Sequence, residues 1–539
     1  MKKSKQVSVI EACEEIMRAL LQLLAWIYVF LVMVVMPFYN TNGYAKIGTN
    51  KYEFFKMITT GLAWIFLPAA ALYLILLLIQ WKKGKTAFQP DLSVTDKFAL
   101  IYGAAVIISY LVSDYKELTN YGDAWQGAYG WYMGTRTQLS FLVAYFAVSR
   151  CWKNKNLLYL LFPVVAVLFG LGYLNRFGVY PIAMEAANPH FISMIGNMNW
   201  YCGYLVTVFF SIIGFWLVSR LEKKWYYPMV ALLVLGFATL VTQGSASGIF
   251  VLVVMLLVLY LLSMKDGERM ERFWLLCSLL FLACSITLVV RKLFPEAITF
   301  QDGLMNLLTD TVLPVVFLIL CGGVCFCVHK MNEKRAYPAK VFTNLGYLAA
   351  GMAILLLIGY IFLLAINTLK PGSIGPLSEL GAFIFDGSWA SNRGATFRAG
   401  VQTFLDQNIV GKLFGVGPDC MAMHLYTKGS GELQQMLTEQ FNTQTLTNAH
   451  CEWLTILANT GICGAVGYIG MIVSAIVRFV RERDKNAMIF GCGLGLLAFT
   501  INNVFSFQQA MNTTTMFLVL GIGEALYRQE KSREIEKKR

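Results

Sequence analysis

The chain has 539 residues, of which 14% are charged and 57% belong to the hydrophobic set AVILMFWYC, and its formal net charge is +13. A typical soluble domain carries roughly 25% charged residues. This composition therefore provides too little polar surface for a water-soluble globule and excludes a cytosolic enzyme, a fibrous protein and a disordered chain. The apolar residues come in blocks of about 18 to 25, the length at which a helix crosses ~30 Å of hydrocarbon. The sequence predicts an all-α fold, a polytopic membrane bundle.

The apolar blocks predict about 14 transmembrane helices. The first block follows the basic head Met1-Lys2-Lys3 and is longer than the apolar part of a secretory signal. Because no small-residue cleavage site follows it, we expect it to be retained. In chain order, the predicted spans are 18–37, 57–80, 97–113, 135–150, 157–175, 200–219, 227–243, 247–264, 273–290, 311–329, 345–366, 453–477, 487–504 and 512–527.

Basic residues mark the loops that face the cytoplasm. If the N-terminus is cytoplasmic, the short inner loops include 81–85, 150–155 and 220–224, and each is rich in Lys and Arg. We therefore predict a multi-pass protein of the cell membrane, in contact with the lipid bilayer, with both termini cytoplasmic. The net charge of +13 is explained by this topology, so we do not expect a nucleic-acid partner.

The outer segment 367–450 is much longer than the other outer loops and is largely polar. Long loops in compact proteins usually carry function. Helix-compatible stretches at 394–406 and 431–440, with Gly and Pro turn signals around them, predict a small extracellular subdomain that rests on the bundle. The chain then divides into N-terminal spans (1–194), central spans (195–366), the large extracellular loop (367–450) and C-terminal spans with a basic tail (451–539).

The interiors of the predicted spans are almost free of Asp, Glu, Lys, Arg and His. Ion-coupled transporters usually keep such groups at mid-membrane, so this pattern weakens a transporter or flippase interpretation but leaves it open. Most cysteines lie in apolar runs and no CxxC pair is present, so we expect no metal and no cofactor. Cys420 and Cys451 are the candidate pair on the outer side, where we favour free thiols over a bridge.

Two arginines stand at the start of a predicted helix in the large loop. Arg393 and Arg398 are separated by Gly394-Ala395-Thr396-Phe397. Guanidinium groups offer forked donors that suit a phosphate or pyrophosphate, and the free amides of a helix N-terminus add to the attraction. A solvated loop arginine is the alternative that spacing alone leaves open.

His450 lies where the large loop re-enters the membrane, two residues before Glu452. A histidine at a wet boundary can keep a pKa near about 6.5 and act as a base, and a neighbouring carboxylate can orient it. An interfacial histidine bound to a backbone carbonyl is the alternative.

Three other outer segments contain candidate binding residues. Asn197 and Asn199 precede a predicted span, where asparagine can hold sugar hydroxyls or cap the helix. The run 242–248 forms a tight turn of small residues between two spans. The loop 123–134 is rich in aromatic residues, which can stack on sugars but which we interpret as belt residues at the membrane interface.

In this order, the segments resemble the O-antigen ligase and O-antigen polymerase family of membrane proteins. The resemblance covers about residues 195–470. It combines an Asn-containing turn, a tight Ser-rich turn, an Arg before an aromatic residue, a GxGP-type turn, and a His element before Gly-x-x-Gly. The residues that carry it are Asn197, Asn199, Arg393, Phe397, Gly415, Gly417, Pro418, His450, Gly461 and Gly464.

The chain also departs from the pattern of that family. Phe397 stands where Trp is usual, Cys451 stands where Asn is usual, and the tight turn 244–247 lacks the usual Arg. Arg136 and Arg176 are the candidate replacements for this cation on the same side. The departures are consistent with a loss of catalysis.

The resemblance implies transfer of a glycan from an undecaprenyl-pyrophosphate carrier to a hydroxyl of a glycan, lipid or protein acceptor at the external face. Arg393, assisted by Arg398, would stabilise the departing pyrophosphate, and His450 would act as the base or orient the acceptor hydroxyl. A transporter or lipid-glycan flippase, and a catalytically inactive member that scaffolds polysaccharide assembly, are the alternatives. The remaining candidate substrate contacts are Asn199, Asn197, Glu452, Gly415 and Gly417.

Overall fold

The computed structural model describes residues 9–82, 91–153, 156–297, 303–442 and 444–538. Within these residues, eleven helices are long and apolar enough to cross a membrane. They are α1 (Val9–Phe30) with its π-helical continuation η1 (Leu31–Val35), α2 (Ile47–Lys82), α3 (Val94–Val112), α5 (Leu157–Arg176), α6 (Met198–Val218), α7 (Lys223–Thr242), α8 (Ala246–Ser263), α9 (Gly267–Leu293), α11 (Leu313–Glu333), α12 (Ala339–Leu369) and α17 (Glu452–Arg481) with its continuation η5 (Glu482–Asp484). The prediction of an all-α, multi-pass membrane protein is confirmed.

The other three predicted spans coincide with α4 (Thr135–Cys151), α18 (Ala487–Asn502) and α19 (Ala510–Lys538). The first two have 17 and 16 residues, which is short for ~30 Å of hydrocarbon. The third begins with the polar run Asn512 to Thr515 and ends in a charged tail. The number of about 14 spans therefore stays a prediction.

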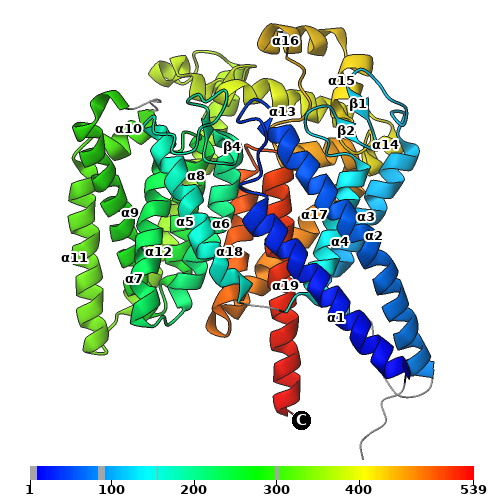
Figure 1. Cartoon of the computed structure of the whole chain (residues 1–539). Coiled ribbons are helices and arrows are strands. Elements are labelled where there is room, and N and C mark those ends of the chain that lie inside the picture. The colour runs from blue at the N-terminus through cyan, green and yellow to red at the C-terminus, as the bar shows by residue number, and fades with distance from the viewer. Residues whose placement is uncertain (1–8, 83–90, 154–155, 298–302, 443, 539) are drawn as a thin grey trace, which may run out of the picture.

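Short elements gather at one end of the bundle (Figure 1). Two antiparallel hairpins lie there, one of β1 (Gly122–Asp123) with β2 (Gly127–Ala128) and one of β3 (Phe191–Ile192) with β4 (Gly196–Asn197). The C-terminal end of α19 emerges at the opposite end. The short helical elements are η2 (Pro295–Ala297), α10 (Gly303–Thr309), η3 (Gly375–Glu379), η4 (Gly381–Phe383), α13 (Trp389–Leu405), α14 (Ile409–Phe414), α15 (Met421–Lys428) and α16 (Gly431–Phe441). We refer to the end that carries α13 to α16 as the outer end, in keeping with the predicted orientation.

The large loop contains more helix than its sequence predicted. The stretches at 394–406 and 431–440 correspond to α13 and α16, but α14 and α15 were not predicted. These two helices have six and eight residues, too few for a periodic apolar pattern to be recognised. A small apolar cluster joins three of the four helices, and its members are Ala399, Met421, Leu425, Leu433, Leu437, Leu446 and Ala449. The division of the chain into four domains stays a prediction.

Small residues let α18 pack closely against α6 in the centre of the bundle. A Cβ atom built on Gly491 would lie 2.5 Å from the carbonyl oxygen of Ser211, and one on Gly495 would lie 1.9 Å from the Ser211 hydroxyl. Both distances are far below a van der Waals contact, so only glycine permits this approach. The end of α18 and the segment that follows it are thereby held deep inside the protein.

Helix α19 is fixed at the inner end by buried ion pairs. The Asp96 carboxylate lies 2.9 Å from Arg150 and 2.5 Å from Arg528, and the Glu524 carboxylate pairs with Arg528 at 3.3 Å and with Arg478. Both carboxylates are fully buried, where such charges are retained only with partners. The pairs connect α3, α4, α17 and α19, so they fix the helix that carries the polar run 512–515.

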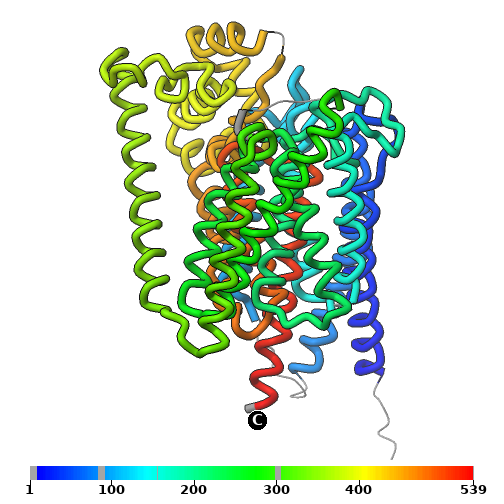
Figure 2. The backbone as a smooth tube through the Cα atoms, turned by 90° about the vertical axis from the view of Figure 1, so that its left-hand side faces the viewer, coloured from blue at the N-terminus to red at the C-terminus, as the bar shows by residue number. Residues whose placement is uncertain are grey.

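Helix α12 stands apart from the bundle (Figure 2). The apolar stretch of this helix has no buried residue, and Leu355 and Leu356 are 70% and 75% exposed. Its contacts lie near its two ends, where the Tyr260 hydroxyl donates to the Phe342 carbonyl and the Tyr360 hydroxyl donates to the Ala382 carbonyl. The middle of α12 therefore presents apolar side chains on all sides, as expected of a helix surrounded by lipid.

Candidate functional site

A buried non-helical segment lies between α18 and α19 at the outer end. In residues 504–509 the chain is not helical, yet Ser506, Phe507, Gln508 and Gln509 are all buried. Buried backbone carbonyls in such a segment need donors from elsewhere. The candidate site is built around this segment.

Arg393 donates to one carbonyl of this segment, that of Phe505. Its Nε and Nη2 atoms donate to the Phe505 carbonyl at 3.3 and 3.0 Å, and Nη1 donates to the Ala390 carbonyl at 3.0 Å. Three residues with positive φ, Ala390 to Asn392, kink the start of α13 directly before this arginine. Burial lowers the pKa of the guanidinium, but an arginine keeps its charge in proteins. The site therefore contains a fixed positive charge.

His450, which comes just before α17, packs against the same segment. Its backbone N–H donates to the Asn448 side-chain oxygen at 3.0 Å, and its ring packs edge-to-face on Phe507, with ring centroids 4.9 Å apart. Burial, and to a smaller extent the charge of Arg393, lowers the pKa of the imidazole from 6.5 to about 4. At neutral pH the imidazole is therefore uncharged, and it is a weaker base than the expected histidine with a pKa near about 6.5. The structure thus brings together the two residues that the sequence singled out for chemistry.

Glu452 faces away from His450. Its carboxylate accepts hydrogen bonds from the Tyr468 hydroxyl at 2.5 Å and from the Asn503 amide, and the Glu452 backbone N–H donates to the Asn503 carbonyl at 3.0 Å. The side chain is fully buried. The structure places it between α17 and α18, inside the protein, rather than beside the imidazole as the sequence spacing suggested.

We expect Glu452→Ala to lower the stability of the protein strongly. The change leaves the buried Tyr468 hydroxyl and Asn503 amide without their acceptor, at a cost of about 1–3 kcal/mol each. Thermal unfolding in detergent should show a clearly lower Tm. The exposed Glu439→Ala is the matched control and should unfold like the wild type; an unchanged Tm for Glu452→Ala would contradict the proposed structural role.

Gly415 and Gly417 serve close packing rather than an open ligand site. The backbone N–H groups of Val416 and Gly417 donate to the carbonyls of Ala458 and Asn459, both at 3.1 Å. A Cβ atom on Gly415 would lie 2.2 Å from the Asn459 carbonyl group, and φ is +78° at Gly415 and +126° at Gly417. The turn therefore pairs with the break in α17 near Gly461, where φ is +66°.

Asp419 ends this turn and fixes the loop 123–134. Its Oδ2 atom accepts hydrogen bonds from the backbone N–H groups of Ala128 at 2.8 Å and Met133 at 2.9 Å. Burial raises the pKa of the carboxyl group from 3.8 to about 7, although the two amides favour the charged form. The loop carrying Trp131 thus depends on a carboxyl group that titrates near neutral pH.

We expect Asp419 to make stability decrease as the pH rises. Because its pKa is higher in the folded chain than in the unfolded chain, the folded form retains a proton that the unfolded form has lost above about pH 4. This contribution to the free energy of unfolding is fully present below about pH 4. It is lost as the pH rises through about 7, and the free energy of unfolding falls by up to about 1.4 kcal/mol per pH unit. Tm measured across this range should fall for the wild type. It should fall less for Asp419→Asn, whose amide oxygen can still accept both bonds; an equal slope for both proteins would refute the assignment.

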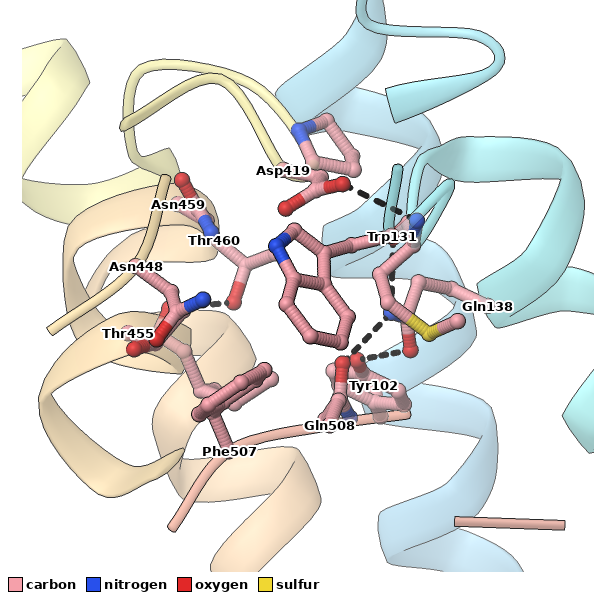
Figure 3. Close-up of a pocket in the computed structure, with 13 residues that line it drawn as sticks. Tyr102, Trp131, Gln138, Asp419, Asn448, Thr455, Asn459, Thr460, Phe507 and Gln508 are labelled. Carbon is pink, nitrogen blue, oxygen red and sulfur yellow. Dashed lines mark hydrogen bonds between the residues drawn. The ribbon is translucent and has the colours of Figure 1, made fainter. Parts of the chain in front are cut away.

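A small cavity of about 20 Å³, which we call the outer cavity, lies next to these residues (Figure 3). The indole of Trp131 points into it, and a hydrogen-bonded chain leads from the Tyr102 hydroxyl to Gln138 at 2.8 Å and from Gln138 to Gln508 at 2.7 Å. Phe507 connects the cavity to His450. The residues that line the cavity are Tyr102, Trp131, Met133, Gln138, Pro418, Asp419, Asn448, Thr455, Ile456, Asn459, Thr460, Phe507 and Gln508.

Trp131 lies in an internal aromatic cluster, whereas the sequence predicted a belt residue at the membrane interface. Its ring packs edge-to-face against Phe507 at 4.7 Å and Trp200 at 5.5 Å between centroids. Interface belts and internal aromatic clusters have the same composition, so only the fold distinguishes them. The sequence offered one signal for such a cluster, which is the number of aromatic and amide residues in the segments expected at the outer end.

The two candidate asparagines differ in what they contact. Asn197 is the N-cap of α6, where its side-chain oxygen accepts from the Asn199 backbone N–H at 2.9 Å. This is the capping alternative that the sequence left open. Asn199 lies in the first turn of α6, one residue before Trp200, whose ring contacts Trp131.

Arg398 points to a different place from Arg393. Its Nη2 atom donates to the Phe385 carbonyl at 2.6 Å, and the guanidinium lies 5.5 Å from the centroid of the Phe385 ring. The residue is exposed. The structure therefore gives Arg398 a surface position and Arg393 the position at the buried segment.

Arg176 supplies a guanidinium to the tight turn that lacks its own. Its Nε donates to the Thr242 carbonyl and its Nη1 donates to the Pro189 carbonyl, both at 2.7 Å. A Cβ atom on Gly244 would lie 2.8 Å from Arg176 Nη2. Arg136, the other candidate replacement, donates instead to Thr60.

No model of a known protein family matches the chain, and no curated protein is significantly similar to it. Among the residues that the structure describes, no group of three or more His, Cys, Asp or Glu side chains is arranged to hold a metal ion. The thiols of Cys420 and Cys451 are both free and buried. The assignment of function therefore depends on the chemistry of the site itself.

Proposed function

We propose that the protein is a membrane glycosyltransferase of the O-antigen ligase and polymerase type, which assembles a cell-surface polysaccharide. It would transfer a glycan from undecaprenyl pyrophosphate to an acceptor hydroxyl at the extracellular face. The observation that carries this proposal is the uncharged imidazole of His450 next to the cation of Arg393, both resting on the buried segment 505–507. A base and a fixed cation are the two groups that this reaction needs.

The proposed step transfers the glycan without a cofactor. The acceptor oxygen forms a bond to the anomeric carbon, the bond from that carbon to the pyrophosphate breaks, and the hydroxyl proton goes to an imidazole nitrogen of His450. The departing lipid pyrophosphate keeps the electron pair and is stabilised by Arg393. An arginine has five N–H donors, and the three contacts of Arg393 leave two for the phosphate oxygens.

The outer cavity would have to widen to admit a sugar, but its lining suits a hydroxyl-bearing acceptor. Its lining combines neutral amides and hydroxyls, such as Asn448, Thr455 and Gln508, with the rings of Trp131 and Phe507. Amides and hydroxyls donate and accept hydrogen bonds as sugar hydroxyls require, and aromatic rings cover the apolar faces of sugars.

A reconstituted assay tests the proposal against its two alternatives. The full-length protein is placed in vesicles that contain an undecaprenyl-pyrophosphate-linked oligosaccharide, and glycan, lipid and protein acceptors are added outside. We expect free undecaprenyl pyrophosphate and glycosylated acceptor to appear together. Movement of the intact donor between leaflets would instead indicate a flippase, and an unchanged donor in both leaflets would indicate a non-catalytic scaffold.

A further inference from the structure

Two apolar hollows join at the inner end of the bundle, far from the site at the outer end. The larger, of about 490 Å³, lies between the inner ends of α5, α6 and α7, and the smaller, of about 110 Å³, continues it toward α18 and α19. Both are lined by Tyr159, Phe162 and Phe215. Hollows of this size accept ligands with long apolar chains.

The mouth of the larger hollow is basic. Arg220 and Glu222 line it and Lys223 and Lys224 follow in the chain, so this short segment has two more basic than acidic residues. Glu222 pairs with Lys224 at 2.8 Å. Arg220 lies 3.3 Å from Glu268, but its side chain is 86% exposed, so this pair is weak and the guanidinium can turn to another anion.

Aromatic rings mark the level of the membrane surface at this mouth. Trp225 and Tyr159 both line the larger hollow, and their rings stack with centroids 6.2 Å apart. Tryptophan and tyrosine prefer the level of the lipid headgroups. An occupant whose chains fill the hollow would therefore have its headgroup beside Arg220 and Lys223.

We propose that this joined hollow binds an anionic glycerophospholipid of the inner leaflet, with its acyl chains between α5, α6 and α7 and its phosphate at Arg220 and Lys223. The apolar lining selects a lipid, and the basic mouth selects a negative headgroup over a zwitterionic one. Each basic residue near an anionic membrane surface strengthens binding by roughly fivefold. The site is independent of the proposed transferase reaction.

Native mass spectrometry of the full-length protein tests this proposal. The protein is incorporated into nanodiscs that contain phosphatidylcholine and phosphatidylglycerol in equal amounts, and the lipid retained after release is identified. We expect retained phosphatidylglycerol in the wild type and roughly 25-fold weaker retention in Arg220→Gln/Lys223→Gln, which removes two charges. The matched control is Arg483→Gln, which removes a charge at the same end beside Asp484 and should retain the lipid.

A second variant tests the hollow without changing its charge. Ala166 lines the larger hollow, so Ala166→Trp fills part of it and should also reduce retention. Equal retention of phosphatidylcholine by the wild type would overturn the selectivity for an anionic headgroup. Unchanged retention in the charge variant would overturn the headgroup site, whether or not Ala166→Trp folds.

Discussion

His450→Ala should abolish glycan transfer while the protein still folds and inserts in the membrane. The neutral imidazole is the candidate proton acceptor at the buried segment, and a positioned general base typically contributes about 10²–10⁴-fold to the rate. Alanine retains the backbone bond to Asn448 but offers no proton acceptor. The rate of transfer in reconstituted vesicles, normalised to inserted protein, should therefore fall by about that factor.

The exposed histidine of the same outer end provides the control for this result. His190 precedes the β3–β4 hairpin and is exposed, so His190→Ala should transfer at the rate of the wild type. The thermal stability of both variants should be similar, which separates loss of chemistry from loss of folding. Full activity of His450→Ala would remove this histidine from the mechanism.

The helical bundle could be predicted from sequence because its signal is local. A block of apolar residues such as 345–366 identifies its helix without knowledge of any partner. Arg393 and His450 could be singled out because one stands at the start of a predicted helix and the other lies where the large loop re-enters the membrane. The predicted spans 487–504 and 512–527 leave their shared segment 505–507 in a loop, but the burial of this loop beside Arg393 and His450 was not predicted.

The directions of side chains could not be predicted. Glu452 follows His450 by two residues, yet it turns inward to Tyr468 and Asn503, because residues at a helix start can face opposite sides. Trp131 reaches the outer cavity from a loop that Asp419 helps to hold, and these two residues are distant in sequence. Such contacts depend on tertiary packing, which a single sequence does not encode as a local pattern.

Arg393→Gln should raise the concentration of lipid donor that transfer requires and lower kcat/KM by about 10²–10³-fold, the usual effect of removing one donor to a developing anion. Glutamine can still donate to the Phe505 carbonyl but has no charge for the pyrophosphate. Loss of the positive charge should also raise the pKa of His450, because Arg393 contributes to its lowering. The acid limb of the pH–rate profile, which follows protonation of the imidazole, should therefore move to higher pH.

The two readouts together distinguish a role in the reaction from support of the backbone. If Arg393 only holds the segment 505–507 in place, Arg393→Gln lowers Tm, and Arg393→Lys, which keeps the charge but lacks the fork, restores the acid limb but not the donor requirement. If it binds the pyrophosphate, Arg393→Lys recovers the acid limb and part of the affinity for donor, because lysine supplies the charge without the fork. Lys370→Gln removes an exposed cation from the outer end of α12 and should change neither quantity. A donor dependence identical to the wild type in Arg393→Gln would show that the cation does not contact the substrate.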